Sequence, residues 1–216
     1  LLFMNGKNQT PATEAGPGCI FAIAKLIEVL MAHWKGLTYM AIIGMDTGED
    51  KPDAHPKWFG LANFEPYRKA QAKWLEEALA RPEIASAKFK VLFCHIPLYA
   101  APDHPDYSHD GVKVDPQDYA YWSRECFELW NPIMEKAGIQ LVVAGHKHRY
   151  RHDLPSPGRR WHQVVGGGHE LGFAHGKPDA GRFPTVIEGV VKNGRLVVTA
   201  HDVFKNRIAE TFTIDQ

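Results

Sequence analysis

The sequence LVVAGHKHRY at residues 141–150 joins a short apolar run to a glycine and two closely spaced histidines, His146 and His148. The apolar run is typical of a strand buried in a sheet, and Gly145 marks the turn at which that strand ends. Two imidazoles therefore leave the end of one strand together. Because neutral imidazole is a good ligand for first-row metal ions, this stretch predicts a metal site.

A second stretch, FKVLFCHIP at residues 89–97, has the same form: an apolar strand ends at His95, and Pro97 prevents the strand from continuing. Three histidines at two strand ends suggest a single metal site. Asp46 follows a further apolar run and is a candidate ligand, although an aspartate at a strand end more often caps a loop. His109, in the long polar loop after His95, is a candidate substrate contact, with a solvated surface loop as the simpler interpretation.

The hydrophobic pattern along the chain predicts an α/β layered domain that ends in an antiparallel meander. The expected strands are residues 1–4, 38–45, 89–95, 139–144, 161–165, 185–191, 196–203 and 208–214. The expected helices are residues 20–33, 65–80 and 118–137, the last with a kink or break at Pro132 and a glycine cap at Gly138. Asn193-Gly194 predicts a type I′ hairpin turn.

Composition narrows the class of protein. The chain has 216 residues, of which 44% are hydrophobic and 23% charged, which favours one globular domain over residues 1–216. Its formal net charge is zero, so no basic field indicates nucleic-acid binding. Three scattered cysteines do not form a disulfide framework, and no apolar run reaches the roughly 20 residues of a membrane span.

The two histidine stretches resemble the C-terminal signatures of the calcineurin-like metallophosphoesterases, in particular their purple-acid-phosphatase-like bacterial branch. DTGED at residues 46–50 and QAKWL at residues 71–75 fit that branch as well. The resemblance implies a layered α/β/β/α sandwich and a dinuclear site at which metal-activated hydroxide hydrolyses a phosphate mono- or diester. It places His95 and His146 on one divalent ion and His148 on the other, without distinguishing Zn, Fe, Mn and Ni.

The chain departs from the family pattern upstream. No Asp-x-His or Gly-Asp-x-x-Asp motif precedes GKNQT at residues 6–10, which stands where the family has Gly-Asn-His-Glu. In strict register Asn8 replaces the catalytic histidine and Lys7 replaces an asparagine ligand, whereas a one-residue shift makes Asn8 that ligand. No secretory signal opens the chain. Because the upstream motifs are missing and the chain begins within an expected strand, we expect it to be the C-terminal portion of a metallophosphoesterase domain.

Three interpretations follow from this comparison with the family pattern. The first is a phosphoesterase that is incomplete as this chain. The second is a non-catalytic remnant that keeps the fold and binds one metal ion or none. The third is a mononuclear hydrolase that uses His95, His146 and His148 together with Asp46, an arrangement with an open position for water.

Overall fold

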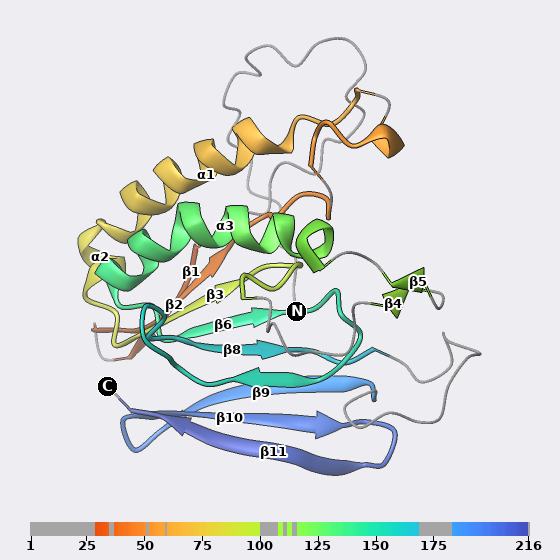
Figure 1. Cartoon of the computed structure of the whole chain (residues 1–216). Coiled ribbons are helices and arrows are strands. Elements are labelled where there is room, and N and C mark those ends of the chain that lie inside the picture. The colour runs from red at the N-terminus through yellow and green to blue at the C-terminus, as the bar shows by residue number, and fades with distance from the viewer. Residues whose placement is uncertain are drawn as a thin grey trace.

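Two sheets and a layer of helices make up the computed structural model, which describes residues 29–34, 37–50, 52–58, 60–99, 108–109, 112–113, 116–168 and 183–215. The first sheet has the strand order β1-β2-β3-β6-β8-β7 (Figure 1). Its strands are β1 (Val29–Trp34), β2 (Leu37–Gly44), β3 (Phe89–Phe93), β6 (Leu141–Ala144), β7 (Arg151–Asp153) and β8 (His162–Val165). Strands β2, β3, β6 and β8 are parallel to one another, and β1 and β7 close the two edges in antiparallel fashion.

The second sheet is an antiparallel meander in the order β11-β10-β9. Its strands are β9 (Thr185–Lys192), β10 (Arg195–Asp202) and β11 (Arg207–Ile214). Asn193 and Gly194 join β9 to β10, and both have positive φ, 53° and 75°, as the predicted type I′ turn requires. Alternate residues of β10 are buried, so one face of the meander packs inward.

The helices lie on the face of the first sheet that is turned away from the meander (Figure 1). They are α1 (Phe64–Leu79), the short α2 (Pro82–Ala85) and α3 (Pro116–Ala137), and a 3-10 turn η1 (Pro56–Trp58) precedes α1. A two-stranded ribbon, β4 (Ser108–His109) and β5 (Val112–Lys113), precedes α3. Within the described ranges, no helix is both long and apolar enough to cross a membrane.

The sequence predicted both long helices. The buried residues of α1 recur at three- and four-residue intervals, as an amphipathic helix requires: Arg68, Gln71, Ala72, Leu75, Ala78 and Leu79. Helix α3 continues through Pro132, so of the two predicted alternatives, a kink or a break, the break does not occur. Pro132 is exposed, whereas Trp130 and Met134 on either side of it are fully buried and hold the helix on the core. Gly138 ends α3 with φ +69°, which confirms the predicted cap.

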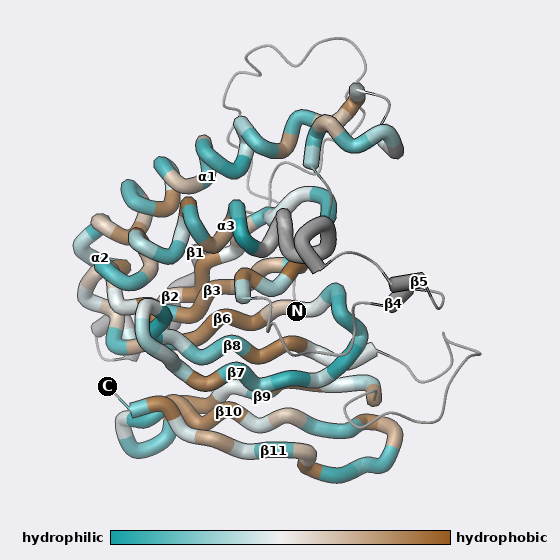
Figure 2. The backbone as a smooth tube through the Cα atoms, viewed as in Figure 1, coloured by the Kyte–Doolittle hydropathy of each residue, from teal (hydrophilic) through white to brown (hydrophobic). Residues whose placement is uncertain are grey.

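Apolar side chains form two cores, one on each face of the first sheet. Residues of α1 and α3, including Leu75 and Trp130, pack against Ile43, Leu92 and Val142. On the opposite face, Phe89, Val91 and Val164 pack against residues of the meander. The central strands are hydrophobic along their length, whereas the helices alternate between hydrophobic and hydrophilic residues (Figure 2). The described elements thus form an α/β/β arrangement, which confirms the predicted α/β class.

The structure differs from the predicted elements at β1 and at β7. Residues 29–34 form strand β1, paired antiparallel with β2, and not the end of a helix over residues 20–33; residues 20–28 lie outside the described part of the chain. Leucine, methionine and alanine in this segment favour a helix locally, but pairing with β2 prevails. Strand β7 was not predicted, because three polar residues give no periodic signal.

The carboxyl ends of the parallel strands meet at one edge of the first sheet. Hydrogen bonds continue beyond the strands there: Met45 N–H donates to Phe93 O at 2.8 Å, and Gly145 N–H donates to His95 O at 2.9 Å. The loops that follow β2, β3 and β6 are therefore held side by side. In open α/β sheets this edge is where ligands bind.

Candidate metal centre

The predicted histidines at two strand ends come together. His95 follows β3 and His146 follows β6, and His146 Nδ1 lies 3.2 Å from His95 Nε2. The two rings stand edge to face, with centroids 5.1 Å apart and an interplanar angle of 85°. His95 is exposed and His146 is partly buried, so the pair faces solvent at the carboxyl edge of the sheet.

The turn that carries His146 and His148 has an unusual backbone. Both residues have positive φ, 67° and 52°, which non-glycine residues seldom adopt. The hydrogen bond from Lys147 N–H to Gly145 O, 2.7 Å long, closes a tight turn around His146. Backbone strain of this kind costs about 1–3 kcal/mol per residue and is concentrated at functional sites. The strain supports a functional interpretation of this turn.

The surroundings of His146 keep its imidazole neutral. Burial, followed by the neighbouring His95 and Lys147, lowers the pKa of His146 to about 4, with Asp50 opposing the shift. Metal ions bind neutral imidazole, so His146 needs to release no proton at neutral pH in order to act as a ligand. Asp50 Oδ2 lies 4.0 Å from the second nitrogen of the same ring, Nε2.

Residues of α1 hold the loop after β2 against this pair. The Arg68 guanidinium donates to Thr47 O at 2.9 Å and to Glu49 O at 2.7 Å, and it forms an ion pair with Glu125 at 2.6 Å. Arg68 is fully buried. Gln71, one turn further along α1, accepts from Asp46 N–H at 2.9 Å and donates to Asp46 O at 2.6 Å. The loop at residues 46–50 is therefore anchored at three of its carbonyl groups, those of Asp46, Thr47 and Glu49.

The loop that carries His95 is anchored equally well. Ile96 N–H donates to Thr47 Oγ1 at 3.1 Å, which joins this loop to the one after β2. Gln163 of β8 accepts from Tyr99 N–H at 3.0 Å and donates to Tyr99 O at 2.9 Å. Thr47, Arg68 and Gln163 were not predicted as site residues, because each acts on a loop far away in the sequence.

Asp46 is engaged within its own loop. Its Oδ1 accepts a hydrogen bond from Gly48 N–H at 2.8 Å, and its carboxylate is hydrogen bonded to the Tyr67 hydroxyl. Burial, followed by the charge of Asp46, raises the pKa of Tyr67. The carboxylate thus organises the turn at residues 46–48, as strand-end aspartates commonly do. Its role as a metal ligand stays a prediction.

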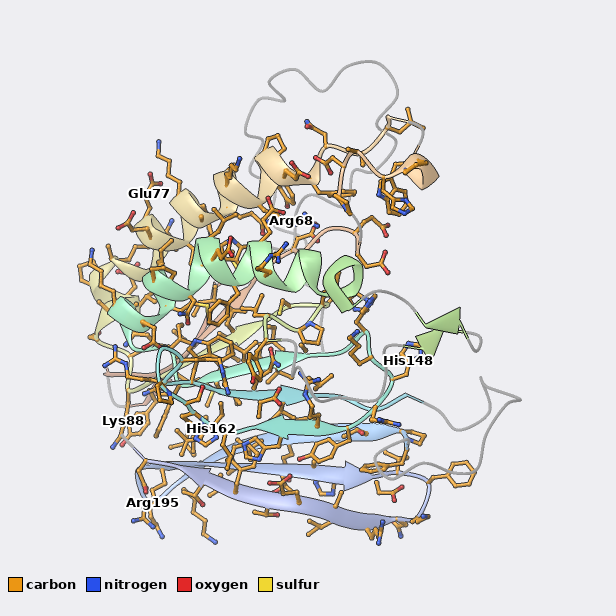
Figure 3. The ribbon with its side chains drawn as sticks, in the orientation of Figure 1. Arg68, Glu77, Lys88, His148, His162 and Arg195 are labelled. Atoms are coloured by element: carbon orange, nitrogen blue, oxygen red, sulfur yellow. The ribbon has the colours of Figure 1, made fainter. Side chains whose placement is uncertain are left out.

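His148 lies beyond the end of β6, at the edge where the parallel strands finish, whereas His162 lies at the start of β8 (Figure 3). The imidazole of His148 is exposed. A Cβ added to Gly168 would lie 2.8 Å from His148 Cβ, and one added to Gly167 would collide with Phe183 O. Gly167 and Gly168 thus permit a close approach of the segment after β8 to its neighbours.

The remaining candidate residues are only partly described. Asn8 lies outside the described residues. The backbone of His109 forms β4 and pairs with Val112, and its side chain is not among those described, so its contact with substrate stays a prediction.

Burial raises the pKa of the Cys94 thiol well above its ordinary value, so Cys94 remains protonated and is a poor nucleophile.

The donor chemistry of the histidine pair fits a metal ion. Two nitrogens bound to one tetrahedral zinc ion at about 2.0–2.1 Å lie about 3.3 Å from each other, close to the separation of His95 Nε2 and His146 Nδ1. Among the side chains that the structure describes, no three His, Cys, Asp or Glu residues converge closely enough to hold an ion by themselves. The role of His95 and His146 as metal ligands stays a prediction.

A second histidine cluster connects the two sheets. His152 lies 2.7 Å from Glu210 through Nδ1 and 3.0 Å from His162 through Nε2. The Tyr150 hydroxyl donates to Glu210 at 2.7 Å, and Phe212 stacks on His152 with a centroid distance of 3.8 Å. Burial and the nearby His152 lower the pKa of His162 to about 4. Every imidazole nitrogen of His152 is used in this cluster, which joins β7 and β8 to β11.

Comparisons with known proteins give structural matches alone. No protein-family model matches the chain, and no curated protein matches it. The chain is similar to purple acid phosphatase PPD1 from seeds of yellow lupin, Lupinus luteus, at 14% identity and a TM-score of 0.53, over 82% of this chain and 31% of that one. It is also similar to GAP50, the anchor in the inner membrane complex of Plasmodium, at 15% identity and a TM-score of 0.50, over 87% of this chain and 53% of that one.

The chain spans less than two thirds of the length of either neighbour. At this level of identity the likeness concerns the fold. The helical layer, the parallel strands and the packed meander correspond to the α/β/β part of the α/β/β/α sandwich that the sequence resemblance implied. The chain has the α/β fold of the calcineurin-like metallophosphoesterases.

Proposed function

We propose that this chain is part of a metal-dependent phosphoesterase that hydrolyses a phosphate mono- or diester. In this proposal His95 and His146 bind one divalent metal ion, and His148 binds a second. The observation that supports it most directly is the 3.2 Å approach of His146 Nδ1 to His95 Nε2, at the edge of the sheet where ligands bind in this class of fold.

Divalent ions at this edge would supply Lewis-acid stabilisation of the charge that develops on a phosphoryl group. The residues of this chain would bind and orient the ions: the strained turn after β6 presents His146 and His148, and the anchored loop after β3 presents His95. The two nitrogens of His95 and His146 do not complete a metal centre by themselves, so in this proposal further residues or water molecules complete the coordination of each ion. Zn, Fe, Mn and Ni all suit imidazole ligands.

Calorimetric titration with Zn²⁺ and Mn²⁺, together with turnover of chromogenic phosphate mono- and diesters, tests the proposal. The wild-type chain should bind metal and release the chromophore. Replacing His95 or His146 with alanine should weaken metal binding at least tenfold, by analogy with losses around known metal sites. His201→Ala is the matched control, because His201 lies on the meander, in an ion pair with Glu188. Equal metal affinity in His95→Ala and His201→Ala would contradict the proposal.

A non-catalytic chain with the same fold is the second candidate. It is favoured by the absence of a three-ligand group among the described residues and by the likeness to GAP50, an anchor protein. Metal binding without turnover of either ester would favour this candidate. The number of metal equivalents separates the remaining interpretations, because a dinuclear phosphoesterase binds two ions and a mononuclear hydrolase binds one.

A further inference from the structure

Asp50 lies on the far side of the His146 ring from His95. The Nδ1 edge of the ring faces His95 at 3.2 Å, and the Nε2 edge faces Asp50 Oδ2 at 4.0 Å. Both side chains are largely shielded from solvent, with exposed fractions of 21% for His146 and 19% for Asp50. A single imidazole thus lies between a candidate metal ligand and a carboxylate.

This arrangement favours one tautomer of His146. A carboxylate repels the lone pair of a deprotonated ring nitrogen and attracts an N–H group, so Asp50 favours a proton on Nε2. With that proton in place, Nδ1 carries the lone pair and accepts a hydrogen bond from His95. The contact with His95 is compatible with this tautomer, in which the lone pair of Nδ1 faces His95 Nε2.

The position of Asp50 is built into the fold and does not depend on an unsupported surface loop. Arg68 holds the carbonyl groups of Thr47 and Glu49, the latter immediately before Asp50. Gln71 holds both backbone polar groups of Asp46. A fully buried arginine paired with Glu125 gives this loop a rigid support from α1. The loop therefore presents Asp50 to His146 in a defined position.

We infer that Asp50 is a positioning residue of the metal centre: its carboxylate holds the proton of His146 on Nε2, which leaves Nδ1 to bind the metal ion that His95 binds. The inference rests on the proposed function and adds to it a residue that does not itself touch the ion. Carboxylates that orient a ligating histidine in this way commonly change metal affinity by about 10- to 100-fold when they are removed.

Two measurements on the whole chain test Asp50. The first is the protonation pattern of the His146 ring in the metal-free protein at pH 7, read from two-bond ¹H–¹⁵N correlations and assigned by comparison with His146→Gln. The second is Zn²⁺ affinity by calorimetry. Asp50→Asn keeps the shape of the side chain and removes its charge. Glu49→Gln is the matched control, because it removes the same charge from an exposed neighbour in the same loop.

The wild-type protein should show a protonated Nε2 and an unprotonated Nδ1 on His146. Asp50→Asn should transfer part of the population to the other tautomer and weaken Zn²⁺ binding by about 10- to 100-fold, whereas Glu49→Gln should leave both quantities unchanged. A proton on Nδ1 in the wild-type protein overturns the inference. Equal Zn²⁺ affinities of the two variants overturn it while the proposed function stands. A wild-type chain that binds neither Zn²⁺ nor Mn²⁺ overturns the proposed function, and the inference with it.

Discussion

Gly168 approaches His148 so closely that a Cβ at position 168 would lie 2.8 Å from the Cβ of His148. Real Cβ atoms do not come this near to each other, so the glycine at 168 is what allows the segment after β8 to pass against the turn after β6. The contact joins two loops at the carboxyl edge of the sheet, one of which carries His146 and His148.

Gly168→Ala should destabilise the protein by about 1–3 kcal/mol, the usual cost of forcing extra volume into a packed site. The added methyl group would also displace His148 from its position. Urea unfolding monitored by circular dichroism measures the first effect. Gly189→Ala is the control, because a Cβ there meets Leu196 Cδ1 at an ordinary 3.6 Å. Equal stability of the two variants would show that the segment after β8 can move away freely.

An alanine variant is usually more stable than a glycine variant at the same position. The positive φ of His148 predicts the opposite order of stability there. At φ 52° an L side chain is strained, and a left-handed conformation costs about 1–2 kcal/mol, which glycine avoids. His148→Gly should therefore be more stable than His148→Ala by about 1 kcal/mol, although both lose the same imidazole. The matched pair at Lys147, whose φ is not positive, should show alanine as the more stable variant. The midpoints of urea unfolding decide between the two orders.

Arg68 should be far more important to stability than its helical neighbours. Arg68→Met removes a fully buried cation and leaves Glu125 and two loop carbonyl groups without a partner. Breaking a buried ion pair from one side costs about 3–5 kcal/mol. Lys69→Met changes an exposed residue next to it and should stay within about 0.5 kcal/mol of wild type. Similar melting temperatures for the two variants would contradict this assignment.

Much of the fold was predictable because its signals are local. The run at residues 141–144 followed by glycine, the three- and four-residue periodicity of α1, and the Asn193-Gly194 turn each carry their structure within a few residues. Strand β1 carries a misleading local signal, since residues 29–34 include good helix formers. Strand β1 forms because it pairs with β2, and this pairing cannot be read from the residues of β1 alone.

The site divides in the same way. His95 and His146 were predicted to meet, because parallel strands bring their carboxyl ends to one edge. The sequence indicated Asp46, the residue that closely follows the strand, as the candidate acidic site residue, and it did not indicate Asp50. The position of Asp50 depends on the hydrogen bond from Arg68 to Glu49 O. This hydrogen bond joins α1 to a loop about 20 residues earlier in the chain. The sequence signal that could have indicated the position of Asp50 is Arg68, a charged residue on the buried face of α1.

The His162 imidazole predicts how stability depends on pH. Burial, followed by the charges of His152 and Arg159, lowers its pKa from 6.5 to about 4. Between these values the unfolded chain binds a proton that the folded chain does not bind. Stability from this group is therefore complete above pH 6.5 and is lost as the pH falls toward 4. Because the imidazole is partly exposed, the loss amounts to about 1–2 kcal/mol and not to the full value of the shift.

Replacing His162 with glutamine removes this titration. The slope of the unfolding free energy against pH between 4 and 6.5 should become shallower in His162→Gln than in wild type, even if the variant is less stable at every pH because His152 loses a partner. His201→Gln controls for the loss of a surface histidine and should keep the wild-type slope. Urea unfolding at half-unit intervals of pH measures both slopes. A slope in His162→Gln as steep as in wild type would show that groups other than His162 cause the acid sensitivity between pH 4 and 6.5.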